Sequence, residues 1–283
     1  TPSPPLSPTL TWTAVPPTVT PAPARTAGPT QEPGAPPRVP DPLWVANETS
    51  GELLLIDSDD NSIAVIIPTN LNPRWVGSDE DFIWALDPNH DALIQVDSRT
   101  YAILRVIPFP DRDVDALAVG AGAVWVAYTE RAGMLYLLPQ EDYTPNGGVL
   151  RLDPRSGEID GNARTGPVIA MAVQPAPAFV WALGRGPVDT PLLRIDPQTL
   201  AVQPLALSGS ADWALDDAFA LTVDGIWLYS AAFGKLYHAN PDGQLFAEIH
   251  VGQRKPLAPP SLLAGQGDIW LAAPWPALLR IDP

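Results

Sequence analysis

The chain has 283 residues, of which 46% are hydrophobic, so it is long enough to bury one large core or two small ones. Its formal net charge of −16, from 32 Asp and Glu against 16 Lys and Arg, would repel a phosphate backbone and argues against nucleic acid as a partner. The sequence contains no cysteine, which excludes a disulfide framework, a thiol nucleophile and a thiolate metal site.

Residues 1–42 have the composition of a spacer. They are rich in Pro and Thr, as in Pro-Thr-Val-Thr-Pro-Ala-Pro-Ala, and contain almost no large apolar side chains. Proline fixes φ and removes an amide donor, so extended polyproline-like conformers are favoured over a packed element. We expect a disordered leader over residues 1–42 and a folded domain over residues 43–283. The alternative, a ligand for an SH3-like groove, lacks the flanking basic residues.

The leader also bears on where the protein works. Pro/Thr/Ser tracts of this kind are similar to the stalks that hold bacterial surface domains off a membrane. No run approaches the roughly 18 apolar residues of a membrane helix, so we expect no transmembrane segment in this chain. The first residue is Thr1, so a signal peptide or membrane anchor would lie upstream. We therefore expect an extracytoplasmic protein, secreted or on a bacterial cell surface.

From residue 43 onwards the chain repeats. An apolar-Trp-apolar step recurs at intervals of 40 to 56 residues, and a second step that ends in Asp or Asn follows each one. The repeated tryptophans are Trp44, Trp84, Trp125, Trp181, Trp227 and Trp270. The residues that end the second step are Asp57, Asp97, Asp153, Asp196, Asn240 and Asp282. With the β-branched runs between them, each repeat has four short strands.

A period of 40 to 50 residues with four strands predicts the blades of a β-propeller. The fold class is therefore all-β, with six visible repeats of four-stranded blades. The first repeat has no innermost strand, because residues 36–40 carry three prolines, and the sixth stops at Asp282-Pro283 before its outer strand. We expect a fragment of a six-bladed ring, and a truncated seven-bladed ring stays open as an alternative.

The turns between the third and fourth strands have a sequence pattern that is similar to that of known propeller families. Asp153-Pro154, Asp196-Pro197 and Asn240-Pro241 place Asp or Asn at the first position of a type I turn and Pro at the second. Together with the Trp-Val-Ala step, they make residues 43–283 resemble bacterial propellers of the NHL-like and YVTN-like repeat type and the streptogramin (virginiamycin B) lyases. The resemblance implies the fold, and this scaffold serves many functions.

The repeated residues have structural explanations. A tryptophan at one fixed position in every strand is typical of packing between blades rather than of ligand stacking. The Asp and Asn residues are explained as turn caps, without a ring of metal ligands. We expect no calcium loop to begin at Asp57, because Ser62 replaces its glycine and Pro68 its bidentate Glu.

Catalytic candidates are few. The resemblance to streptogramin lyases implies a Glu-x-His pair with a divalent metal, just ahead of an innermost strand. The sequence Glu248-Ile249-His250 matches the pair but falls in a predicted outer strand, and the corresponding slots elsewhere contain no histidine. There is no Ser-His-Asp set, phosphate loop or HExxH motif. The sequence thus predicts no catalytic residue, metal site or cofactor, and a metal-assisted lyase or hydrolase remains the alternative.

The repeats differ most in the loops of one rim. These are the insertion over residues 128–148, the loop over residues 184–191 and the connection over residues 208–219, in repeats three to five. The candidate binding residues on this rim are Tyr136, Tyr143, Arg185 and Trp213 in these loops and Trp275 in the sixth repeat. Aromatic and arginine side chains in loops on a rigid scaffold are typical of binding faces. We therefore expect a monomeric, non-catalytic module that binds a protein, peptide or glycan, and a solvated insertion packing on itself is the alternative.

Overall fold

The computed structural model describes residues 43–57, 60, 62–131, 146–175, 177–184, 192–205, 218–222, 225–230, 234–251, 261–265, 268–272 and 278–281. The chain divides into two units, Thr1–Ala35 and Pro36–Pro283, and all the described residues belong to the second. The predicted leader, residues 1–42, lies outside the described residues.

Within these residues the chain forms 22 strands and no helix. The first two sheets contain β1 (Leu43–Asn47), β2 (Glu52–Asp57), β3 (Ser62–Pro68), β4 (Trp75–Ser78), β5 (Phe82–Asp87), β6 (Ala92–Asp97) and β7 (Ile103–Pro108). The next two contain β8 (Arg112–Gly120), β9 (Ala123–Glu130), β10 (Gly147–Leu152), β11 (Ile159–Arg164), β12 (Val168–Pro175), β13 (Ala178–Gly184), β14 (Leu192–Ile195) and β15 (Val202–Leu205). The last two contain β16 (Ala218–Leu221), β17 (Ile226–Ser230), β18 (Lys235–Ala239), β19 (Leu245–His250), β20 (Ser261–Gly265), β21 (Asp268–Ala272) and β22 (Leu278–Ile281).

Each sheet is an antiparallel meander of strands that follow one another in the chain. Four sheets have four strands, whereas the first, β1-β2-β3, and the last, β20-β21-β22, have three. The predicted all-β fold with four-stranded blades is confirmed. The structure does not show six complete blades, because only four of the six sheets reach four strands within the described residues. By the position of the repeated tryptophan, the described part of the first sheet has no innermost strand and that of the last sheet no outer strand, as the sequence led us to expect.

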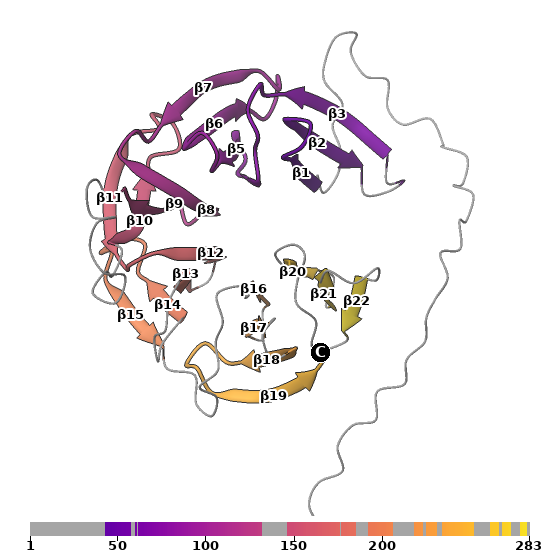
Figure 1. Cartoon of the computed structure of the whole chain (residues 1–283), viewed down its shortest axis with the longest axis vertical. Coiled ribbons are helices and arrows are strands. Elements are labelled where there is room, and N and C mark those ends of the chain that lie inside the picture. Colours follow the sequence, from indigo (N-terminus) through magenta and orange to yellow (C-terminus); the bar gives the residue numbers. More distant parts are fainter. Residues whose placement is uncertain are drawn as a thin grey trace, which may run out of the picture. The chain divides into compact units, whose positions relative to one another are not determined.

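The sheets of the second unit follow one another around a common centre (Figure 1). The first strand of each sheet contacts the first strand of the next, from β1 to β4, β8, β12, β16 and β20. Each of the five core clusters joins two consecutive sheets; in one of them Trp84 and Leu93 of the second sheet pack with Val124 and Leu150 of the third. This arrangement is that of a β-propeller.

Burial on both faces explains the sequence of the central strands. In β5 and β9 almost every residue is buried, which matches their nearly continuous apolar runs. Strand pairing places each repeated tryptophan opposite the same position of the following strand. The pairs are Trp44–Leu55, Trp84–Gln95, Trp125–Arg151, Trp181–Arg194, Trp227–His238 and Trp270–Arg280.

The equivalent tryptophans are not equally buried. Trp84, Trp125, Trp181 and Trp227 are at most 2% exposed, whereas Trp44 is half-buried. The side chain of Trp270 lies outside the described part of the structure. Equal burial at all the tryptophan positions therefore does not hold for Trp44, since no innermost strand lies beside β1 within the described residues.

Polar residues of the third strands tie consecutive sheets together. Gln95 donates from Nε2 to the carbonyl oxygen of Pro154 at 2.8 Å, and Arg151 donates from NH1 to that of Pro197 at 2.8 Å. Both acceptors lie in Asp-Pro turns of the next sheet. His238 instead stacks on Trp227, with ring centroids 4.0 Å apart. The residues opposite the tryptophans thus have a structural role at Gln95, Arg151 and His238.

The turns that follow the third strands are capped by side chains. The Oδ1 of Asp153 accepts from the amides of Arg155 at 3.0 Å and Ser156 at 2.7 Å. Asp97, Asp196 and Asn240 accept equivalent bonds from amides two to four residues ahead. These bonds favour the charged carboxylate, and they lower the pKa of Asp97, Asp153 and Asp196 below the usual value.

Candidate functional site

The loops in which the repeats differ most lie at one end of the sheets. Because consecutive strands run in opposite directions, the loop after each tryptophan strand and the connection to the next sheet lie at the same end. We call this end the rim. In the first three sheets it includes the loops 48–51, 88–91 and 131–146 and the connections 69–74, 109–111 and 165–167.

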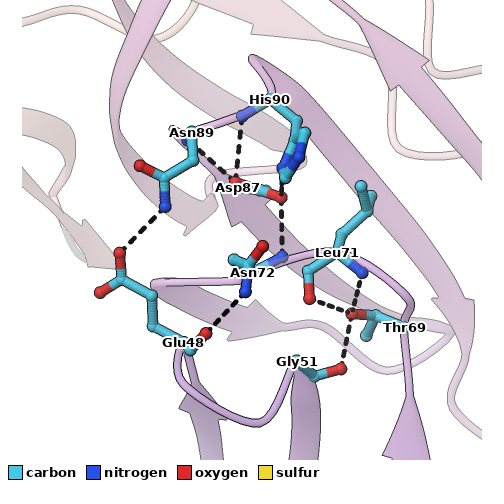
Figure 2. Close-up of polar contacts among 8 residues, drawn as sticks. All are labelled: Glu48, Gly51, Thr69, Leu71, Asn72, Asp87, Asn89 and His90. Carbon is cyan, nitrogen blue, oxygen red and sulfur yellow. Dashed lines mark hydrogen bonds and ion pairs between the residues drawn. The ribbon is translucent and has the colours of Figure 1, made fainter.

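Asp87, at the end of β5, is the centre of a polar cluster on the rim. Its side chain is fully buried, and Figure 2 shows donors converging on it from two segments. Oδ1 accepts from the amides of Asn89 at 2.9 Å and His90 at 3.2 Å. Oδ2 accepts from the amide of Asn72 at 2.7 Å and lies 2.6 Å from Nδ1 of His90. Asp87 therefore fixes both its own loop and the connection from the first sheet.

The same cluster reaches across to the first sheet (Figure 2). Asn72 donates from Nδ2 to the carbonyl oxygen of Glu48 at 2.9 Å, and Asn89 donates from Nδ2 to Oε1 of Glu48 at 3.1 Å. Next to them, the Thr69 hydroxyl donates to the carbonyl oxygen of Gly51 at 2.8 Å. The loop after β1, the connection to β4 and the loop after β5 are thus held as one unit.

The loop after β5 also reaches the third sheet, through Asp91. Oδ1 of Asp91, whose side chain is 11% exposed, accepts from the amide of Val114 at 3.1 Å, and Oδ2 forms an ion pair with Arg131. Arg131 also pairs through Nε with Asp113 at 2.7 Å and donates from NH1 to the carbonyl oxygen of Pro110 at 3.0 Å. The bond to Asp113 and the charge of Asp91 raise the pKa of Arg131 above its usual value, so its charge persists at any physiological pH.

Arg131 stands at the base of the insertion between β9 and β10. The two sides of this base are joined by a bond from the amide of Glu130 to the carbonyl oxygen of Asn146 at 2.8 Å. Glu130 also pairs with Arg164 of β11. The insertion therefore emerges from a base that is fixed to β8, β11 and the second sheet.

The Glu-x-His pair lies where the sequence predicted, on the outer strand β19. There Oε1 of Glu248 is 2.7 Å from Nζ of Lys235 and 3.4 Å from Nε2 of His250. An ammonium group already occupies this carboxylate oxygen, and the pair offers only two metal-binding side chains. These residues therefore do not fit a divalent-metal centre of the kind that the lyase resemblance implied.

The candidate binding residues Tyr136, Tyr143, Arg185, Trp213 and Trp275 all lie outside the described residues. The described rim instead contains Asp87, Asp91 and Arg131; Arg131 falls within the predicted insertion over residues 128–148, whereas Asp87 and Asp91 were not predicted as site residues. The signal available for Asp87 was the sequence Asp87-Pro88, which repeats the Asp-Pro pattern of the turns at the opposite end. No comparable signal marks Asp91, because its partner Arg131 lies 40 residues further along the chain.

The described residues contain no group of three or more His, Asp or Glu side chains arranged to hold a metal ion. No helix long and apolar enough to cross a membrane is present among them.

Comparison with known proteins finds relatives in structure only. No protein-family model matches the chain, and no curated protein matches it. A streptogramin B lyase superposes with a TM-score of 0.60 at 12% identity, over 86% of this chain and 79% of that one. This chain is similar in fold to streptogramin lyases.

Other solved structures give the same result. A catalytically inactive virginiamycin B lyase from Staphylococcus aureus, crystallised with quinupristin, gives a TM-score of 0.62 at 16% identity, over 86% of this chain and 78% of that one. A Kuenenia stuttgartiensis hydrazine synthase gives 0.63 at 13% identity, over 86% and 80%. The likeness to streptogramin lyases predicted from the sequence is thus confirmed for the fold, which proteins of other functions share.

Proposed function

We propose that this chain is a non-catalytic binding or scaffold module that works outside the cytoplasm and takes a protein, peptide or glycan on its rim. The observation that carries the proposal is the fixed base of the insertion after β9. Arg131 is held by Asp91, Asp113 and the Pro110 carbonyl, and the amide of Glu130 bonds to Asn146. Loops on a rigid base are where scaffolds of this kind hold binding residues, because little order is lost on binding.

The charge on the rim indicates the chemistry of the ligand. Glu48 and Asp111 lie on the rim of the first three sheets, where Arg131 already pairs with Asp91 and Asp113, and the whole chain carries a formal charge of −16. A ligand with basic groups would be attracted by this field at low salt. Among the three ligand classes, we therefore favour a basic protein or peptide.

The test is a binding screen with loop variants. Peptide and glycan arrays first identify a ligand; Tyr143→Ala, Trp213→Ala and Arg185→Ala are then compared with the parent chain by isothermal titration calorimetry. Truncating an anchor at a binding face typically costs about 2 kcal/mol or more. The control is Arg99→Ala, since Arg99 lies at the opposite end, where its ion pair with Asp81 is exposed. Unchanged affinities in the three loop variants would remove the proposal.

The likeness in fold to streptogramin lyases supports one alternative, a metal-assisted lyase or hydrolase. Quinupristin, present with the Staphylococcus aureus lyase, is the substrate to try. Because Glu248 pairs with Lys235 on an outer strand, we expect no conversion by mass spectrometry and no change in melting temperature between Mg²⁺ and EDTA. Metal-dependent turnover that Glu248→Gln abolishes would favour the alternative.

The proposed location has its own test. Antibody detection in separated fractions of the source cells should find the chain in the envelope or the medium. Detection in the cytoplasmic fraction alone would contradict this part of the proposal.

A further inference from the structure

Five turns of the described chain share one pattern, and the turn after β5 differs from the others at one position. Each begins with an Asp or Asn side chain that accepts the amides of the third and fourth residues, and the fifth residue has a φ between 47° and 71°. The turns are 47–51, 87–91, 97–101, 153–157 and 196–200. The fourth residue is Ser or Thr in four of them, and it is His90 in the turn after β5.

A hydroxyl at the fourth position is sufficient to cap this kind of turn. The Thr100 hydroxyl donates to Oδ1 of Asp97 at 2.9 Å. In the turn after β5, Nδ1 of His90 instead lies 2.6 Å from Oδ2 of Asp87. The imidazole therefore does the work of the hydroxyl and adds a second ring nitrogen, Nε2, which Ser or Thr would not provide.

The contact with Asp87 determines which ring nitrogen of His90 carries the proton (Figure 2). Oδ2 of Asp87 also accepts the amide of Asn72 at 2.7 Å, so this oxygen is an acceptor and Nδ1 of His90 is the donor. In the neutral ring, Nε2 then has the free lone pair. The side chain of Asp87 is 0% exposed and that of His90 is 53% exposed, so a buried group orients a ring that reaches the surface.

Glu48 adds a negative charge beside this turn. Nδ2 of Asn89 donates to Oε1 of Glu48 at 3.1 Å, which holds the exposed carboxylate against the turn that carries His90. Among the described residues Glu48 forms no ion pair, whereas Arg131 already pairs with Asp91. Nε2 of His90 and the carboxylate of Glu48 are both hydrogen-bond acceptors. An ammonium or guanidinium group has donors and no acceptor, and it is therefore the kind of group that matches them.

We propose that Nε2 of His90, with the carboxylate of Glu48 beside it, binds a cationic group of the ligand, the ammonium of a lysine or the guanidinium of an arginine in a basic peptide. This inference rests on the proposed function and identifies the part of the rim that recognises such a peptide. A ligand N–H donates to Nε2, and the carboxylate supplies the opposite charge. Because Asp87 and Asn89 already hold the two acceptors, little side-chain freedom is lost on binding.

The probes are penta-arginine and penta-lysine peptides labelled with fluorescein and titrated with the full chain by fluorescence anisotropy. His90→Thr is the first variant, because threonine keeps the cap of the turn and removes Nε2. Glu48→Gln is the second, because glutamine keeps an acceptor for Asn89 and removes the charge. The matched controls are His250→Thr, 72% exposed on β19, and Glu158→Gln, exposed at the end opposite the rim.

We expect at least one probe to bind the parent chain and both controls alike, and to bind His90→Thr and Glu48→Gln about tenfold more weakly, equivalent to about 1.4 kcal/mol. The probe that binds identifies the cationic group. If His90→Thr does not fold by circular dichroism, Glu48→Gln and the parent chain keep the test valid. Long-range proton–nitrogen NMR spectra of the parent should show the ring proton of neutral His90 on Nδ1.

The proposal would be overturned by a parent chain that binds neither probe, by equal binding to a folded His90→Thr or to Glu48→Gln, or by equal losses in the controls. A neutral His90 ring with its proton on Nε2 would overturn it as well. These failures are distinct from a failure of the proposed function, which is measured with the ligand from the array screen and the variants of Tyr143, Trp213 and Arg185.

Discussion

At the scale of single residues, one short side chain repeatedly fixes a turn. Asp97, Asp153 and Asp196 accept backbone amides in the turns after their strands, and Asn240 does so in the fifth sheet with an uncharged amide. The sequence predicted these caps because Asp or Asn at the first position of a turn, followed by Pro in three of the four cases, is typical of a capping side chain. The charge of the three aspartates is therefore not required for the geometry, although it makes the turns sensitive to acid.

Replacing the three aspartates by asparagine should flatten the acid side of the stability curve. Their pKa values are lower in the folded chain than in the unfolded chain, where Asp titrates at about 3.9. Their contribution is therefore complete above that pH and is lost as the pH falls through the lower folded values. Urea unfolding of the triple variant Asp97→Asn, Asp153→Asn, Asp196→Asn between pH 2 and pH 6 should show a smaller loss of stability than the parent. An identical pH dependence would contradict this account.

Asp87 should be the most sensitive single residue on the described rim. Its buried carboxylate accepts three backbone amides and contacts His90 Nδ1, so Asp87→Ala removes the acceptor of four part-buried contacts at once. We expect a loss of about 3 kcal/mol in the free energy of unfolding, measured with urea. The control Asp81→Ala removes an exposed ion pair with Arg99 and should cost less than about 1 kcal/mol. Equal losses in the two variants would show that the cluster does not hold the rim together.

At the scale of the strands, the tryptophan position shows what the sequence could and could not predict. The spacing of the repeats predicted the strand and the register, because each tryptophan meets the same position of the next strand. It did not predict the unequal burial of Trp44, since burial depends on a neighbouring strand and not on the local sequence. Trp44 also makes an edge contact with Tyr101 of the second sheet, 5.8 Å between ring centroids.

Removing the indole should therefore have different costs at equivalent positions. Trp125→Ala deletes a side chain that is 0% exposed and should lower the free energy of unfolding by about 3–5 kcal/mol. Trp44→Ala should cost clearly less, because half-buried Trp44 loses less buried area and solvent can fill part of the space. Chemical denaturation of the two variants measures the difference directly. A larger loss for Trp44→Ala would mean that the first sheet is covered in solution.

At the scale of the whole molecule, a repeat of four strands was enough to predict the propeller and its incomplete first and last repeats, although the described residues do not form six complete blades. The repeat predicts which neighbouring segments pair as strands. The number of strands in each sheet also depends on whether a further segment pairs with the outermost strand. The rim was hard to predict for a related reason. Its bonds join residues far apart in the sequence, such as Asn89 with Glu48 and Arg131 with Asp91, and no local pattern specifies such pairs.

The central claim, that ligands bind at the rim, is tested most directly by hydrogen–deuterium exchange of the full chain with and without the ligand found in the array screen. We predict slower exchange at the loops 131–146, 184–191 and 206–217 when the ligand is present. Exchange in the turns at the opposite end, 97–102, 153–158 and 196–201, should stay the same. Protection confined to those turns, with the rim loops unchanged, would contradict the account.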